Sequence, residues 1–128
     1  MKKILVVDDV EGIRRELALF LEDENYKVFQ ADDGLKAIKI INSESIDLVI
    51  SDILMPNMDG LELSKYLENN HPNIPSILIS GGGNVYKKDI NATDDLLSQA
   101  QMLTRARVLL KKPFSTEELL TQIKTILE

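Results

Sequence analysis

The chain has 128 residues, of which 44% are hydrophobic and 28% are charged, so we expect one compact domain spanning residues 1–128. Fifteen basic and twenty-one acidic residues give a net charge of −6, which argues against nonspecific binding to nucleic acid or to a membrane and favours a protein partner. The absence of cysteine excludes disulfides, thiolate metal sites and thiol nucleophiles.

The amino terminus carries a basic pair and a short apolar run, Ile4 to Val7, that stops at two aspartates. Such a run is too short for a signal peptide or a membrane span. We therefore expect the mature chain to start at Met1. Because a chain without cysteine suits a reducing compartment, we predict a cytoplasmic protein.

Short runs rich in Ile, Leu and Val predict buried strands separated by segments with helical spacing of apolar residues. In chain order, the predicted strands are Ile4–Val7, Lys27–Ala31, Ile46–Ile50, Ile77–Ile79 and Val108–Leu110. Strands that alternate with helices in this way indicate a parallel sheet covered by helices on both faces.

The predicted helices follow the strands one by one. Their apolar stripes are Ile13, Leu17, Phe20 and Leu21; Leu35, Ile38 and Ile41; Leu63, Tyr66 and Leu67; Leu96, Ala100 and Leu103; and Leu119, Leu120, Ile123, Ile126 and Leu127. The last stripe follows a capping-box pattern at Ser115 to Glu118. The polar stretch Gly81 to Asp95 predicts a long connection before the fourth helix.

Polar residues follow four of the predicted strands. The first strand ends in Asp8-Asp9, the third in Ser51-Asp52, the fourth in Ser80-Gly81 and the fifth in Lys111-Lys112. Since ligands of open parallel sheets bind beyond the carboxyl ends of the strands, we expect these side chains to converge. A buried carboxylate such as Asp52 needs a partner, and three clustered carboxylates need a proton or a bound cation.

Oxygen-only ligands select a hard cation, and Mg²⁺ suits a few carboxylates together with waters and an incoming phosphoryl group; Mn²⁺ is a possible substitute. With a lysine for one phosphoryl oxygen and a serine hydroxyl for another, the edge has the parts for phosphoryl transfer. Asp52 itself can serve as the nucleophile, because carboxylates form acyl phosphates.

The motifs "LVVDD", "SDILMPNMDG", the strand end at Ser80 and "KKPF" occur in an order that resembles the receiver domains of two-component response regulators, in their stand-alone chemotaxis-regulator-like form. The resemblance runs from Lys3 to about Leu127. It implies a flavodoxin-like, doubly wound α/β fold with five parallel strands in the order 2-1-3-4-5 and five helices.

The resemblance also implies roles for individual residues. Asp52 resembles the phosphoacceptor of the family, and Asp9 and Asp52 would bind Mg²⁺ directly together with the backbone carbonyl of Leu54. Asp8 would bind the ion through water. The roles of Lys112 and Ser80 would be to contact the phosphoryl group, and Ser80 would couple phosphorylation to a change of shape.

The function implied by the resemblance is transfer of a phosphoryl group from a histidine kinase or phosphotransfer protein, followed by signalling through protein contact. The downstream protein is expected at the fourth helix, fifth strand and fifth helix, without nucleic acid or membrane. The chain would be no enzyme beyond catalysing its own phosphorylation and dephosphorylation. Two departures bear on this output: Leu109 occupies a position that is often aromatic in the family, and the interval from Ser80 to Lys112 is unusually long.

Other interpretations of the same residues remain open. Asp8-Asp9 alone is typical of a helix N-cap, and His71 is interpreted as a surface residue without a role. The chain as a whole is also compatible with a receiver-like binding module that phosphorylation does not control. A Mg²⁺-dependent phosphatase with an aspartyl nucleophile is less compatible, because adjacent Asp8-Asp9 does not supply the Asp-x-Asp pair of the haloacid dehalogenase pattern. A flavodoxin-type electron carrier is less compatible still, because the two carboxylates would repel the phosphate of a flavin.

Overall fold

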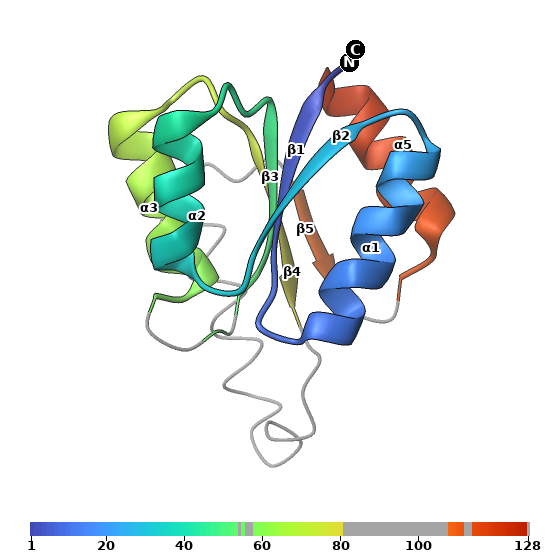
Figure 1. Cartoon of the computed structure of the whole chain (residues 1–128), viewed down its shortest axis with the longest axis horizontal. Helices are drawn as coiled ribbons and strands as arrows, with labels where there is room; N and C mark the ends of the chain where they lie inside the picture. The colour runs from blue at the N-terminus through green and yellow to red at the C-terminus, as the bar shows by residue number, and fades with distance from the viewer. Residues whose placement is uncertain (54, 56–57, 81–107, 112–113, 128) are drawn as a thin grey trace.

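The protein forms one parallel β-sheet with helices on both faces (Figure 1). The structure, a computed structural model, describes residues 1–53, 55, 58–80, 108–111 and 114–127. The strands are β1 (Lys3–Val7), β2 (Lys27–Ala31), β3 (Leu48–Asp52), β4 (Ser76–Ser80) and β5 (Val108–Lys111). They lie in the order β2-β1-β3-β4-β5, as the resemblance implied.

The helices are α1 (Glu11–Asp23), α2 (Gly34–Ser43), α3 (Gly60–Asn70) and α5 (Thr116–Leu127). Helices α2 and α3 cover one face of the sheet, and α1 and α5 cover the other (Figure 1). The expected fourth helix, with Leu96, Ala100 and Leu103, falls outside the described residues.

The interior strand β1 shows why its residues Ile4–Val7 are all apolar. Ile4 and Val6 pack with the α1 and α5 residues Leu21 and Leu119, whereas Leu5 and its neighbour Val7 pack on the α2 and α3 side. These four apolar residues are each at most 1% exposed. Because side chains alternate across a strand, a strand covered on both faces needs a continuous apolar run.

The third strand lies two residues further along the chain than the predicted Ile46–Ile50. Residues Ser51 and Asp52 extend it because they continue the ladder, Ser51 opposite Val7 of β1 and Asp52 opposite Ile79 of β4. The predicted limits follow hydrophobicity, but the actual end depends on pairing with both neighbours.

Two predicted helix stripes need correction. Leu35 is 52% exposed, and the positions of α2 that are buried are Gly34, Ala37 and Ile41. In α1, Ile13 is 42% exposed although its spacing matched the stripe. Both residues lie in the first turn of their helix, and the buried residues of α1 are Ala18 and Leu21.

Local capping bonds fix several helix starts. The Ser115 hydroxyl accepts from the Glu118 amide at 3.0 Å, as the capping-box pattern predicted. Asp59 caps α3 in a box with Glu62 that the sequence analysis did not identify, although the spacing Asp-x-x-Glu was its signal. His71 ends α3, and its Nε2 lies 3.0 Å from Asn42 Oδ1 of α2, so it lies between two helices.

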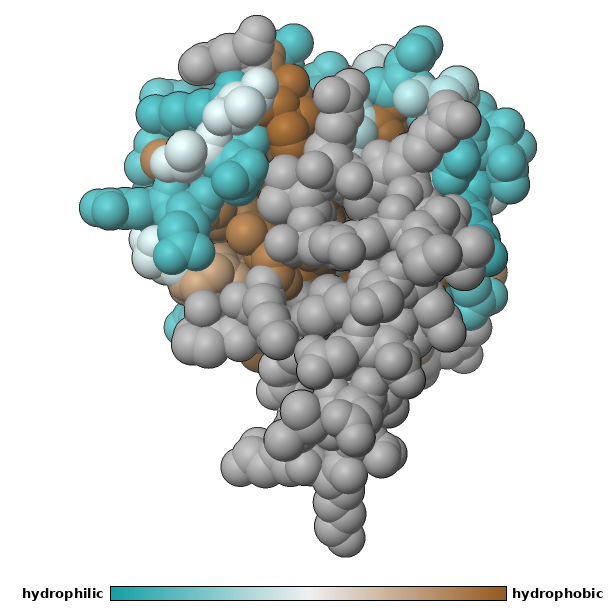
Figure 2. All heavy atoms as spheres, turned by 180° about the vertical axis from the view of Figure 1, so that it is seen from behind, coloured by the Kyte–Doolittle hydropathy of each residue, from teal (hydrophilic) through white to brown (hydrophobic). Residues whose placement is uncertain are grey.

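Seen from behind, apolar atoms lie toward the middle of the molecule and polar atoms cover its two flanks (Figure 2). Among the described residues, none of the helices is long and apolar enough to cross a membrane.

Candidate functional site

Three carboxylates meet at the carboxyl edge of the sheet. Asp8 and Asp9 follow β1, and Asp52 is the last residue of β3, the strand paired with β1. One ligand oxygen from each carboxylate lies within 4.8 Å of the others. Asp8 is buried, Asp52 is half-buried and Asp9 is exposed. The convergence predicted from strand ends is therefore present for these three residues.

Asp8 is held by its backbone as well as by its side chain. Its amide donates to the Ala31 carbonyl at 3.1 Å, and its carbonyl accepts from Arg14 Nη1 at 3.0 Å. Its Oδ1 accepts from the Val10 amide at 2.9 Å. The N-cap of α1 is Val10, and no side chain caps it by a hydrogen bond, so the N-cap interpretation of Asp8-Asp9 is wrong.

Asp52 is positioned by the close packing of the β3–α3 connection. The Ser51 hydroxyl donates to the Asp52 carbonyl at 2.9 Å, and the Gly60 amide donates to the Ile53 carbonyl at 2.7 Å. The Ile53 amide in turn donates to the Ile79 carbonyl of β4 at 2.9 Å. The start of α3 is thereby drawn against the strand end that carries the Asp52 carboxylate.

The residues of this cluster fit a hard divalent cation. All three side chains offer oxygen, which Mg²⁺ prefers over nitrogen or sulfur. Three carboxylates so close together also repel one another, and a cation between them removes that repulsion. Of the three carboxylate residues, Asp9 is the exposed one.

The other predicted site residues are described only in part. Ser80 ends β4 opposite Lys111 of β5, so its backbone lies at the same edge of the sheet, but its side chain is not among the described ones. Lys112 and the Leu54 carbonyl lie outside the described residues, so their roles stay predictions. Leu109 pairs with Leu78 in the register of β4 and β5.

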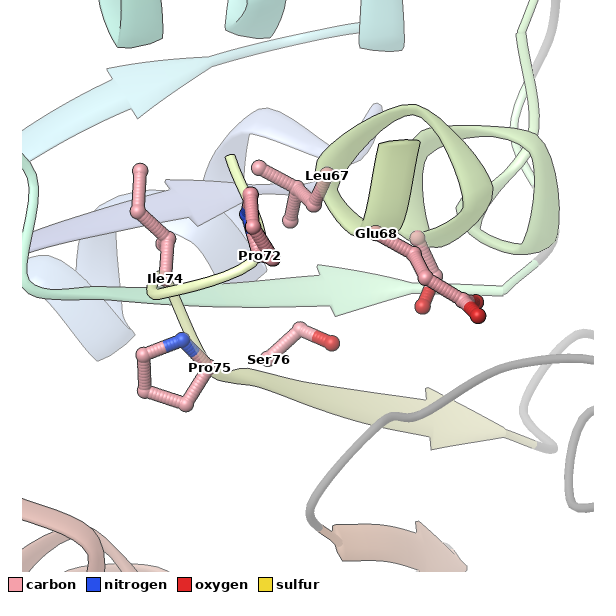
Figure 3. Close-up of a pocket in the computed structure, with 7 residues that line it drawn as sticks. Leu67, Glu68, Pro72, Ile74, Pro75 and Ser76 are labelled. Atoms are coloured by element: carbon pink, nitrogen blue, oxygen red, sulfur yellow. The ribbon is translucent and has the colours of Figure 1, made fainter. Parts of the chain in front are cut away.

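One hollow lies next to the acidic cluster, and a second lies away from it. An apolar one of about 180 Å³ adjoins the cluster, lined by Asp8 together with Ile13, Leu17 and Phe20 of α1 and Phe114 before α5. Another of about 270 Å³ lies at the opposite end of the sheet, between Leu67 and Glu68 of α3 and the beginning of β4 at Ser76 (Figure 3). Asp8 therefore belongs both to the acidic cluster and to the lining of the first hollow.

A doubly wound parallel sheet with carboxylates at the ends of its first and third strands defines a flavodoxin-like α/β protein with an acidic carboxyl edge. Comparison with known protein families assigns the chain to one family within this fold class. The family described as the response regulator receiver domain matches residues 4–124, and the chain belongs to that family.

Similar proteins agree with this assignment. The sporulation initiation phosphotransferase F of Bacillus subtilis is 34% identical over 126 residues, which cover 98% of this chain and 94% of that protein. The crystal structure of the response regulator TrrA of Thermotoga maritima in complex with Mg²⁺-BeF has a TM-score of 0.78 and 34% identity, covering 99% of this chain and 100% of that one. The chemotaxis protein CheY4 of Vibrio cholerae has a TM-score of 0.79 and 30% identity, with 99% of each chain covered.

Some curated relatives are much longer than this chain. The CAI-1 autoinducer sensor kinase/phosphatase CqsS of Vibrio cholerae is 45% identical over 83 residues, which cover 62% of this chain but only 12% of that protein. The chain spans 18% of the transcriptional regulatory protein GlrR of Escherichia coli. Receiver domains thus occur in these relatives as parts of longer proteins.

Proposed function

We propose that this receiver domain accepts a phosphoryl group on Asp52 in a Mg²⁺-dependent reaction and signals by phosphorylation-dependent contact with another protein. The observation that carries the proposal is the meeting of the Asp8, Asp9 and Asp52 carboxylates within 4.8 Å at the carboxyl edge of the sheet. The Mg²⁺-BeF complex of the Thermotoga relative and the phosphotransferase name of the Bacillus relative support it.

The proposed donor is a phosphohistidine of a histidine kinase or phosphotransfer protein. A carboxylate oxygen of Asp52 attacks the phosphorus, the bond between phosphorus and the imidazole nitrogen breaks, and that nitrogen takes up a proton. The product is an acyl phosphate on Asp52, of the kind that carboxylate nucleophiles form. Asp52 suits this role because it is only half-buried and thus open on one side.

The remaining residues have supporting roles in the proposal. Asp8, Asp9, Asp52 and the Leu54 carbonyl hold Mg²⁺, which when bound neutralises charge on the phosphoryl oxygens; Mn²⁺ can replace it. Lys112 pairs with the phosphoryl group. The Ser80 hydroxyl binds a phosphoryl oxygen in the phosphorylated state.

The output is proposed to be a shift between two conformations that exist before phosphorylation. The surface expected to change is formed by the fourth helix, β5 and α5, and the downstream partner is a protein. The chain acts on no separate substrate and catalyses only its own phosphorylation and dephosphorylation. We place this activity in the cytoplasm.

Intact mass measured after incubation with acetyl phosphate tests the proposal. Wild type should gain one phosphate when Mg²⁺ is present and none in EDTA, and Asp52→Ala should gain none. Asp23→Ala is the matched control, because Asp23 is an exposed aspartate at the end of α1, remote in sequence from the cluster. It should be phosphorylated as wild type is.

A wild type that gains no phosphate from acetyl phosphate is next tested with a phosphorylated histidine kinase domain. Failure with both donors contradicts the proposal and favours a binding module that phosphorylation does not control; that module would bind its partner equally well after Asp52→Ala. Repeated hydrolysis of a generic phosphate ester at one site would instead indicate a phosphatase.

A further inference from the structure

Arg14 of α1 connects the helix to two strands beside the acidic cluster. Its Nη1 donates to the Asp8 carbonyl at 3.0 Å, and its Nε donates to Gln30 Oε1 of β2 at 3.3 Å. Arg14 itself is half-buried. No sequence motif marks Arg14, because a lone arginine in the first turns of a helix is ordinarily a solvated charge.

The bond to the Asp8 carbonyl acts on the peptide that joins Asp8 to Asp9. The carbonyl of Asp8 and the amide of Asp9 share one plane, so fixing the carbonyl also fixes the direction in which Asp9 leaves the strand. Asp8 is already tied through its amide to Ala31 at 3.1 Å and through its Oδ1 to Val10 at 2.9 Å. Arg14 adds the restraint that reaches the exposed Asp9.

We propose that Arg14 is a positioning residue of the cation site, which holds the Asp8–Asp9 peptide so that both carboxylates face Asp52. This inference rests on the proposed function, since it assumes that the cluster binds Mg²⁺. Groups that orient metal ligands from outside are a general feature of metal sites, and their loss commonly weakens metal binding about 10-fold to 100-fold.

Because Arg14 is positively charged, a role through charge and a role through positioning predict opposite changes in Mg²⁺ affinity when Arg14 is removed. A fixed cation next to a cation site repels Mg²⁺, so a residue that acted only through its charge would weaken binding, and its removal would tighten binding. A positioning residue has the opposite effect, because its removal releases the peptide that carries the ligands. The direction of the change in affinity therefore separates the two roles.

The experiment is calorimetric titration of Mg²⁺ into the full chain. Arg14→Met should weaken Mg²⁺ binding about tenfold. Arg15→Met is the matched control, because Arg15 is the next residue of α1, is exposed, carries the same charge and pairs with the exposed Glu11 at 3.9 Å. Its Mg²⁺ affinity should stay within about twofold of wild type, since an exposed charge is screened by solvent. Equal or tighter binding by Arg14→Met would overturn the proposal.

Arg14→Lys keeps the charge and one donor but cannot bridge the Asp8 carbonyl and Gln30 with one planar group. It should bind Mg²⁺ more weakly than wild type and more tightly than Arg14→Met. If Arg14→Met does not fold, Arg14→Lys tests the proposal instead. A Mg²⁺ affinity of Arg14→Lys equal to that of wild type would then contradict a positioning role for Arg14.

Amide hydrogen exchange without metal separates this inference from the proposed function. In EDTA, Arg14→Met should exchange the Asp9 and Val10 amides faster than both wild type and Arg15→Met. If wild type binds no Mg²⁺, the proposed function is overturned. The exchange rates of the Asp9 and Val10 amides would still show whether Arg14 restrains the Asp8–Asp9 peptide. Unchanged exchange together with unchanged Mg²⁺ affinity would overturn the role of Arg14.

Discussion

Gly60, the first residue of α3, lies against the backbone of the proposed phosphoacceptor Asp52. A Cβ built on Gly60 would come within 2.4 Å of the Asp52 carbonyl oxygen and 2.8 Å of the Ile53 Cα. Both neighbours are backbone atoms, so they cannot move aside as the tip of a flexible side chain can. The absence of a side chain at Gly60 is what lets α3 begin directly beside the site.

Gly60→Ala should therefore destabilise the protein and displace Asp52. We expect a loss of about 1–3 kcal/mol in the free energy of unfolding, as for overpacking in a core, and slower phosphorylation by acetyl phosphate. Gly12→Ala in α1 is the control, since nothing lies within 4 Å of its added Cβ. That change should stabilise the helix by about 0.5 kcal/mol. Urea unfolding of both variants measures the difference, and equal stabilities would contradict the steric argument.

Asp9→Asn should make the metal-free protein more stable, because it removes one of three mutually repelling carboxylates. We expect a small rise in Tm in EDTA, because solvent screens much of the repulsion at the exposed Asp9. Wild type should gain about 1.4 kcal/mol when Mg²⁺ is present at ten times its Kd, whereas Asp9→Asn should gain much less. Thermal unfolding with and without Mg²⁺ tests both expectations, with Asp23→Asn as the control for loss of one negative charge. A metal-free Asp9→Asn less stable than wild type would show that repulsion does not dominate.

Asp59 should contribute to stability through its cap of α3. Its Oδ1 accepts from the Glu62 amide at 2.8 Å, which pairs a donor that the first turn of a helix leaves unsatisfied. Asp59→Ala should cost about 1 kcal/mol in denaturant unfolding. Asp59→Ser keeps an oxygen at the cap and should recover most of that loss; a serine variant as unstable as the alanine variant would argue against capping.

Asp32 should hold Lys36 protonated to higher pH than usual. Lys36 Nζ lies 3.0 Å from Asp32 Oδ2 and 2.9 Å from Oδ1, and this hydrogen bond and charge raise the pKa of Lys36 above its ordinary 10.5. Because the folded-state pKa is raised, the stabilisation is complete below the ordinary pKa and is lost as pH rises through the folded-state value. Asp32→Asn should lower the Lys36 pKa toward 10.5 in an NMR titration of the lysine side chain. An unchanged titration would show that the pair does not form in solution.

Leu35 and Ile41 of α2 should respond very differently to truncation, although the sequence spacing predicts both on one apolar stripe. Leu35 is 52% exposed and Ile41 is 4% exposed. Ile41→Ala should cost about 2–5 kcal/mol, because it leaves a cavity, and Leu35→Ala about 0.5 kcal/mol or less. Chemical unfolding of the two variants makes the comparison. A large loss for Leu35→Ala would mean that the first turn of α2 is covered in solution.

The sequence by itself determined the parallel sheet and the residues at its carboxyl edge. Short continuous apolar runs such as Ile4–Val7 are typical of strands that are covered on both faces, and a polar residue that follows such a run is expected where the strand ends. That reasoning placed Asp8, Asp9 and Asp52 together before any geometry was known. The strand order came from the family resemblance, because hydrophobic periodicity carries no information about which strands are neighbours.

Only the tertiary structure decided the features that depend on contacts between distant parts of the chain. The end of β3 at Asp52 is set by pairing with β1 and β4, and the contact of Gly60 with Asp52 requires α3 to start at that strand end. The bond from Arg14 to the Asp8 carbonyl and the exposure of Leu35 likewise follow from where each helix lies on the sheet. Local sequence patterns reflect the residues next along the chain, whereas these contacts arise from packing across it.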